Sequence, residues 1–116
     1  MADSDQPRAK TEAPAYECER RVQHVVRPDF RITELQLSPT QKIPWHRHTN
    51  VRDSVYVVRG EIKLFLREPK EEVFLRAGET YTVSAGRPHL VVNGGDASAI
   101  FFLLQGMGEY DFVRLA

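Results

Sequence analysis

Two histidines separated by one residue are the strongest chemical signal in this sequence. His46 and His48 lie in the stretch 44–48, which is flanked by segments typical of β-strands. Side chains alternate between the two faces of a strand, so residues at positions i and i+2 point the same way. Two imidazoles on one face form a pair of ligands for a divalent metal ion.

Two further residues could complete such a site. Asp53 follows His48 by five residues and offers a carboxylate oxygen, and His89 lies in a separate strand-like segment. Three nitrogens and one oxygen that converge from distant segments would hold a metal and leave positions open for water or substrate. The alternative is that the histidines are unrelated surface or core residues. Asp53 in turn could be a turn residue, or could only accept a hydrogen bond from a ligand.

Short apolar runs separated by turn sequences must position these residues. The stretch 61–67 alternates, with Ile62, Leu64 and Leu66 on one face, and Gly or Pro occupies most of the breaks between runs. Together the runs predict an all-β sandwich or barrel. Comparable runs occur at 30–32, 35–37, 55–58, 72–75, 80–83, 90–92, 100–104 and 110–113.

Two stretches near the N-terminus are less regular. The alternation changes phase between Ile32 and Leu35, which predicts a bulge there. Residues 16–26 fit either a helix or a strand, and we favour a strand near Val22. Residues 1–15 are polar and cannot bury enough apolar surface to offset the entropy of ordering. We therefore expect a disordered arm at 1–15 and one β-barrel domain at 16–116.

Composition excludes several classes of function. The 116 residues are 41% hydrophobic, enough for the core of one domain. Lys and Arg together number 16, as do Asp and Glu, so no net charge attracts the chain to nucleic acid or to an anionic membrane. No apolar segment is long enough to span a membrane, and no signal peptide is evident. A single cysteine, Cys18, favours a reducing compartment, so we expect a cytoplasmic protein.

The spacing of these residues resembles the two motifs of the cupin superfamily. In the first motif a His-x-His pair precedes an acidic residue and a glycine; the matching residues are His46, His48, Asp53 and Gly60. In the second motif two glycines precede a histidine and an asparagine; the matching residues are Gly78, Gly86, His89 and Asn93. We expect the glycines and Asn93 to serve turns or strand ends rather than chemistry.

Three positions depart from the family pattern. Thr40 occupies the place of the glycine that opens the first motif, and Ser84 replaces the usual proline of the second. Neither change touches the ligands. Asp53 stands where glutamate is usual, and its side chain is one methylene shorter. The carboxylate would therefore coordinate directly, coordinate through a water, or remain outside the ligand set.

The resemblance implies a fold and a cofactor. The fold is an all-β double-stranded β-helix, a jelly-roll barrel of the RmlC-like cupin type. One divalent metal ion would lie inside the barrel toward one mouth, held by His46, His48, Asp53 and His89. This donor set suits Zn, Fe, Ni, Mn or Cu and does not choose among them. Small cupins commonly exchange strands in dimers, so we expect a homodimer, with residues 16–27 as the exchanged strand.

The expected function is a metal-dependent enzyme of the dioxygenase, isomerase or lyase type that acts on a small organic molecule inside the barrel. A non-enzymatic small-ligand-binding or sensor cupin is the alternative, and a remnant without metal is a third hypothesis. No general base is evident from spacing. The nearest candidates are Glu79, Tyr81, Arg87 and Tyr110.

Overall fold

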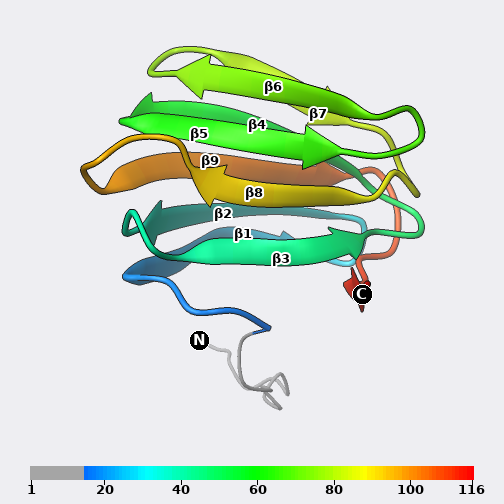
Figure 1. The fold of residues 1–116 in the computed structure, drawn as a ribbon. Coiled ribbons are helices and arrows are strands. Elements are labelled where there is room, and N and C mark those ends of the chain that lie inside the picture. The colour runs from blue at the N-terminus through cyan, green and yellow to red at the C-terminus, as the bar shows by residue number, and fades with distance from the viewer. Residues whose placement is uncertain (1–14) are drawn as a thin grey trace.

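Two antiparallel sheets packed face to face make up the protein. The computed structural model describes residues 15–116, in which ten strands and no helix occur. The strand orders are β1-β2-β9-β4-β7 in one sheet and β10-β3-β8-β5-β6 in the other, and Figure 1 shows the two layers. The strands are β1 Arg20–Arg27, β2 Phe30–Leu37, β3 Lys42–Arg47, β4 Arg52–Arg59, β5 Glu61–Leu66, β6 Glu71–Arg76, β7 Thr80–Val83, β8 His89–Asn93, β9 Ala99–Gly106 and β10 Val113–Arg114.

The core fills the space between the inner faces of the sheets. Burial alternates strictly along β5, and along β9 every second residue is buried while its neighbours are partly exposed, as expected for strands with one face on the core. The expected wall residues Ile62, Leu64 and Leu66 are buried, and Phe101 rather than Phe102 points inward. The predicted all-β double-stranded β-helix is confirmed. The described residues include no helix that is long and apolar enough to cross a membrane.

The predicted bulge in β2 is wrong. β2 pairs with β9 without any register shift from Phe30 to Leu37, and the shift lies instead in β1, between Gln23 and Val25. The phase change has another cause, because β2 turns polar residues inward at its start. Arg31 and Thr33 continue the inner face of Leu35 and Leu37, so the neighbouring apolar residues face outward.

The structure also defines two other stretches of the chain, 110–113 and 16–26. The run 110–113 was expected to be a strand, but only Val113 and Arg114 pair, with β3, and residues 110–112 are irregular. The ambiguous stretch 16–26 contains β1, which pairs with β2 of its own chain. Exchange of this strand between subunits stays a prediction. The expected disorder of the N-terminal arm concerns residues that, apart from Ala15, lie outside the described range.

The turn between β4 and β5 requires glycine at position 60 for two reasons, its backbone conformation and its close contact with residues 98 and 99. Its φ is +82°, and an added Cβ would lie 3.0 Å from both the Cα of Ala99 and the carbonyl oxygen of Ser98. Gly78 has a similar φ of +89° but no atom within 4 Å of an added Cβ. We expect Gly78→Ala to cost about 1–2 kcal/mol for the left-handed backbone, and Gly60→Ala about 1 kcal/mol more for the crowding. Urea unfolding of both variants measures the difference, and equal losses would contradict a role for the contact.

Candidate metal centre

Four residues from three strands and one loop meet inside one end of the barrel. His46 lies in β3, His48 directly after it, Asp53 in β4 and His89 at the start of β8. One ligand atom from each lies within 4.8 Å of those of the other three. All four residues are at most 2% exposed. We call them the His/Asp cluster.

Strand pairing explains why these residues converge. His46 is the register partner of His89 where β3 pairs with β8, so the two rings share one face of that sheet. The ring centres of these two residues are 4.1 Å apart. Asp53 belongs to the opposite sheet and points inward with Val55 and Val57. The His/Asp cluster therefore bridges the two inner faces of the barrel.

Backbone carbonyls fix the orientation of all three imidazoles. Nδ1 of His46 lies 2.7 Å from the oxygen of Pro44, Nδ1 of His48 2.6 Å from that of Asp111, and Nδ1 of His89 2.9 Å from that of Arg87. A carbonyl oxygen only accepts, so each Nδ1 must carry the proton and donate it. The Nε2 atoms are then left for the centre of the His/Asp cluster, as in histidines that bind metals.

The carboxylate of Asp53 occupies the same centre. Its Oδ2 lies 3.1 Å from Nε2 of His48 and 3.2 Å from Nε2 of His89, and its Oδ1 is buried without a hydrogen-bond partner. In neutral rings these Nε2 atoms carry lone pairs, which the carboxylate oxygen would repel. A proton on each nitrogen or a shared cation removes the repulsion. The donor set and the unpartnered Oδ1 therefore fit a divalent ion.

Ionisation of the metal-free cluster follows from burial and from Asp53. Burial, reinforced by the charge of His89, lowers the pKa of His46 to about 3, so this ring is neutral. Burial also opposes protonation of His48, but the hydrogen bond and charge of Asp53 outweigh it and raise the pKa of His48. Burial acts against ionisation of Asp53, and hydrogen bonds from His48 and His89 overcome it and hold the pKa of the carboxyl below its usual range. The carboxylate is thus available as a ligand.

Aromatic residues from the segment after β9 cover the His/Asp cluster. The ring of Phe112 stacks on His46 with a centroid distance of 4.4 Å and an angle of 10°, and the Tyr110 ring lies 5.4 Å from that of His48. Asp111, between them, also fixes the loop, because its Oδ1 accepts a hydrogen bond from the backbone N–H of Thr49. The sequence offered no sign of these roles for Asp111 and Phe112, since nothing in it placed this segment over the histidines.

Of the four candidate bases, only Tyr110 places its side chain against the His/Asp cluster, whereas Arg87 meets His89 through its backbone carbonyl alone. Tyr81 and Arg87 form a surface network in which both donate hydrogen bonds to Glu71. The carboxylate of Glu79 accepts from the backbone of Arg76. Burial raises the pKa of Tyr110, so its hydroxyl keeps its proton.

The remaining motif residues have structural roles. Asn93 donates from Nδ2 to the carbonyl oxygens of Leu37 and Ala97, which ties the end of β8 to the end of β2 and to the loop before β9. Gly60, Gly78 and Gly86 have positive φ, as turns require. His24 is the fourth histidine, and it lies on the surface beside Glu34.

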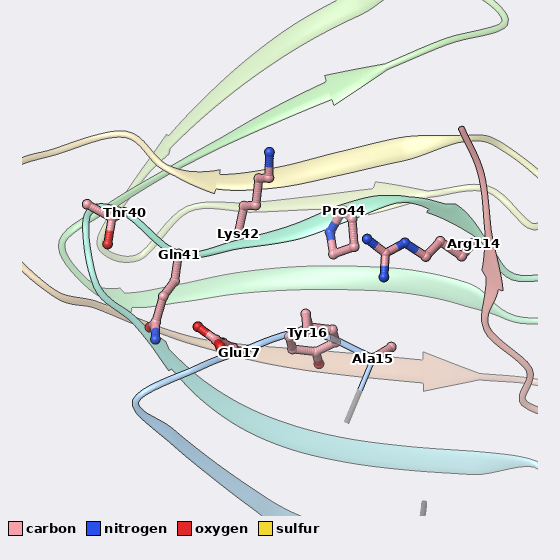
Figure 2. A pocket seen from close by; sticks show the side chains of 8 residues that line it. All are labelled: Ala15, Tyr16, Glu17, Thr40, Gln41, Lys42, Pro44 and Arg114. Carbon is pink, nitrogen blue, oxygen red and sulfur yellow. The ribbon is translucent and has the colours of Figure 1, made fainter. Parts of the chain in front are cut away.

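A shallow pocket of about 290 Å³ lies outside the barrel wall near the His/Asp cluster. Figure 2 shows Tyr16, Arg114 and Pro44 of β3 among its lining side chains. Tyr16 also contacts Phe112, with ring centres 6.2 Å apart, and Phe112 stacks on His46. None of the cluster residues lines this pocket, and all four are buried, so the pocket does not expose the His/Asp cluster.

Sequence comparison identifies a family. Residues 33–112 match the profile described as the cupin domain, which is more than half of the chain. No curated protein sequence matches.

Solved structures share the fold. A conserved protein with a double-stranded β-helix domain from Klebsiella pneumoniae is 21% identical with a TM-score of 0.73, over 92% of this chain and 93% of that one. An oxalate oxidase is 19% identical with a TM-score of 0.68, over 75% of this chain and 46% of that one. An oxalate decarboxylase from Lactobacillus farciminis, crystallised with formate, has the same identity and TM-score, over 75% and 27%. The chain thus spans about half the oxalate oxidase, and these identities show similarity of fold alone.

Proposed function

The chain belongs to the cupin domain family, and on that premise we propose that it is a metal-dependent enzyme acting on a small organic molecule inside the barrel. The supporting observation is the convergence of three oriented imidazoles and one buried carboxylate. His46, His48, His89 and Asp53 would hold the ion. Once bound, a divalent ion would polarise a substrate oxygen or lower the pKa of a water molecule.

Residues of the chain would supply the other parts of the site. Asp53 contributes one negative charge, so a divalent ion with three neutral imidazoles leaves a net charge near +1, which favours an anionic oxygen. Phe112 and Tyr110 cover the His/Asp cluster and exclude water. The protonated hydroxyl of Tyr110 can donate a hydrogen bond to a substrate oxygen. Dioxygenase, isomerase and lyase reactions are the classes that we propose.

Assembly and compartment form part of the same proposal. β1 is an edge strand of its sheet, and its free backbone groups suit pairing with a second copy, so we propose a homodimer. Cys18 is a free thiol, which suits the cytoplasm.

A non-enzymatic ligand-binding or sensor cupin is the second candidate function. The observation in its favour is the near-complete burial of all four cluster residues, at 1–2% exposure. A metal ion enclosed in this way could fix the fold or a bound ligand without meeting a substrate. The two functions differ in turnover but not in metal binding.

Elemental analysis of the purified protein, followed by activity screens, tests the proposal. We expect one equivalent of a divalent metal per chain, and turnover of at least one compound when the loaded protein is screened for oxygen uptake on catechols, diketones and thiols and for lyase or isomerase products. Stoichiometric metal without turnover, but with a rise in Tm on addition of a small ligand, would favour the binding function. Absence of metal, together with an unchanged Tm in chelator, would contradict both.

A further inference from the structure

A polar row crosses the inner face of one sheet beside the His/Asp cluster. Arg31 in β2 is the register partner of Gln105 in β9, and Gln105 is the register partner of Asp53 in β4. Directly paired residues lie on the same face with Cβ atoms about 5 Å apart. Gln105 is 4% exposed and Asp53 is 2% exposed. Register alone therefore places Arg31 on the inner face, two strands from a cluster ligand.

Tyr110 joins the Arg31 side chain to the His/Asp cluster. The guanidinium carbon of Arg31 lies 3.9 Å from the centre of the Tyr110 ring, which is 5.4 Å from the centre of the His48 ring. The guanidinium is therefore no farther from the His48 ring than these two distances combined. A molecule of four to six carbons that touches the His/Asp cluster can reach it.

Arg31 has no anionic partner within the described part of the chain. No ion pair in residues 15–116 involves it, and its buried Nε has no hydrogen-bond partner. Burial lowers the pKa of the Arg31 guanidinium, and the positive charge of Arg21 adds to this. Arg21 itself donates a hydrogen bond to the hydroxyl of Tyr16. A partly buried guanidinium without an anionic partner among residues 15–116 is costly for that part of the fold, and an incoming anion would offset the cost.

The sequence of β2 is consistent with a binding role. Leu35 and Leu37 fill the inner face at one end of the strand, whereas Arg31 and Thr33 occupy the equivalent positions nearer the His/Asp cluster. An apolar residue at position 31 would extend the core at lower cost. Arginine presents a planar fork of donors that matches a carboxylate in a bidentate manner, and lysine does not.

We propose that Arg31 binds a carboxylate at one end of a small organic acid whose other end faces the His/Asp cluster. This inference rests on the proposed function and assigns its substrate class. Tyr110 positions the guanidinium by stacking, and Gln105 lies between the two ends of the acid. Neutral molecules of the same size would offer Arg31 no carboxylate and bind more weakly.

Paired α-keto acids measure this preference without turnover. Each pair has the same chain length and the same keto-acid head to face the cluster, but only one member carries a distal carboxylate: oxaloacetate and 2-oxobutyrate, 2-oxoglutarate and 2-oxopentanoate, 2-oxoadipate and 2-oxohexanoate. Calorimetric titration into protein loaded with Zn²⁺, which has no redox chemistry, gives the affinities. We expect at least one dicarboxylate to bind about 10- to 100-fold more tightly than its partner.

Two variants of Arg31 and one control variant test whether Arg31 causes the preference for dicarboxylates. Arg31→Gln should reduce the ratio to near one, and Arg31→Lys should keep part of it. Arg59→Gln removes an exposed arginine from the opposite end of β4 and should leave the ratio unchanged. Zn²⁺ stoichiometry and Tm are measured for each variant, so that loss of folding is seen separately from loss of recognition.

The outcomes separate this inference from the function on which it rests. A wild-type protein that binds Zn²⁺ but prefers no dicarboxylate, or an Arg31→Gln variant that binds Zn²⁺ and keeps the wild-type ratio, overturns the role of Arg31 and leaves the metal site standing. Failure of the wild-type chain to bind Zn²⁺ overturns both. Loss of the ratio in Arg31→Gln alone supports the inference.

Discussion

Replacement of His89 by alanine lowers the affinity of the protein for Zn²⁺ by more than about 100-fold. Loss of only the residue that orients a metal ligand typically costs about 10- to 100-fold, and His89 would be a ligand itself. The substitution removes the ring that faces His46 across the β3–β8 pairing and one of the two nitrogens beside Asp53 Oδ2. Competition with a chromophoric chelator measures the affinity.

His24→Ala is the matched control for this substitution. His24 is exposed and pairs with Glu34 on the outer surface, so its loss should leave Zn²⁺ affinity unchanged. Circular dichroism of both metal-free variants establishes that the barrel is intact. Equal Zn²⁺ affinities for the wild type and for His89→Ala would show that His89 is not a ligand.

Removal of the metal reverses the sign of the pH dependence of stability as the pH rises above about 6.5, the ordinary pKa of histidine. In the metal-free protein Asp53 raises the pKa of His48 above the value of about 6.5 for a free histidine. The stabilisation from this pair is complete below about pH 6.5 and is lost as the pH rises through the raised pKa. The lowered pKa values of His46 and Asp53 lie below this range and add no slope within it.

The metal-bound protein follows the opposite trend. Protons compete with the ion for the imidazoles, so metal affinity, and with it the stabilisation of the folded state, increases with pH. One proton contributes at most about 1.4 kcal/mol per pH unit in either direction. Thermal unfolding in chelator and in excess Zn²⁺ at several pH values measures both slopes.

Asp53→Asn sharpens the comparison, because it removes the charge that raises the His48 pKa. The decline in stability of the metal-free protein should then disappear. Parallel slopes with and without metal in the wild-type protein would contradict a site in which the ion replaces protons on the histidines.

Local patterns were sufficient to predict which four residues converge in the barrel. His46 and His48 share a face because strand geometry requires it at i and i+2, and the motif spacing added Asp53 and His89. The role of Asp53 was harder to predict from the sequence. Its side chain is one methylene shorter than the usual glutamate, so the sequence left open whether its carboxylate reaches the site. The structure puts its Oδ2 beside two imidazoles, because β4 directs it inward from the opposite sheet.

The remaining parts of the site depend on long-range pairing that no local pattern contains. Arg31 belongs to the site only because β9 lies between β2 and β4, and its inward position was misread as a bulge. Tyr110 and Phe112 alternate as strand residues do, but their rings pack on histidines instead of continuing a strand. In both cases the contacts join residues more than 50 positions apart, which sequence periodicity does not report.

The hydrogen bond from His48 to the carbonyl of Asp111 has a consequence for biosynthesis. The two residues are 63 positions apart, so His48 leaves the ribosome well before the group that fixes its tautomer. A nascent chain that has produced all four cluster residues still lacks this carbonyl and the ring of Phe112. Tight binding of an ion would therefore come only after residues 111 and 112 have been translated, when most of the barrel can already fold.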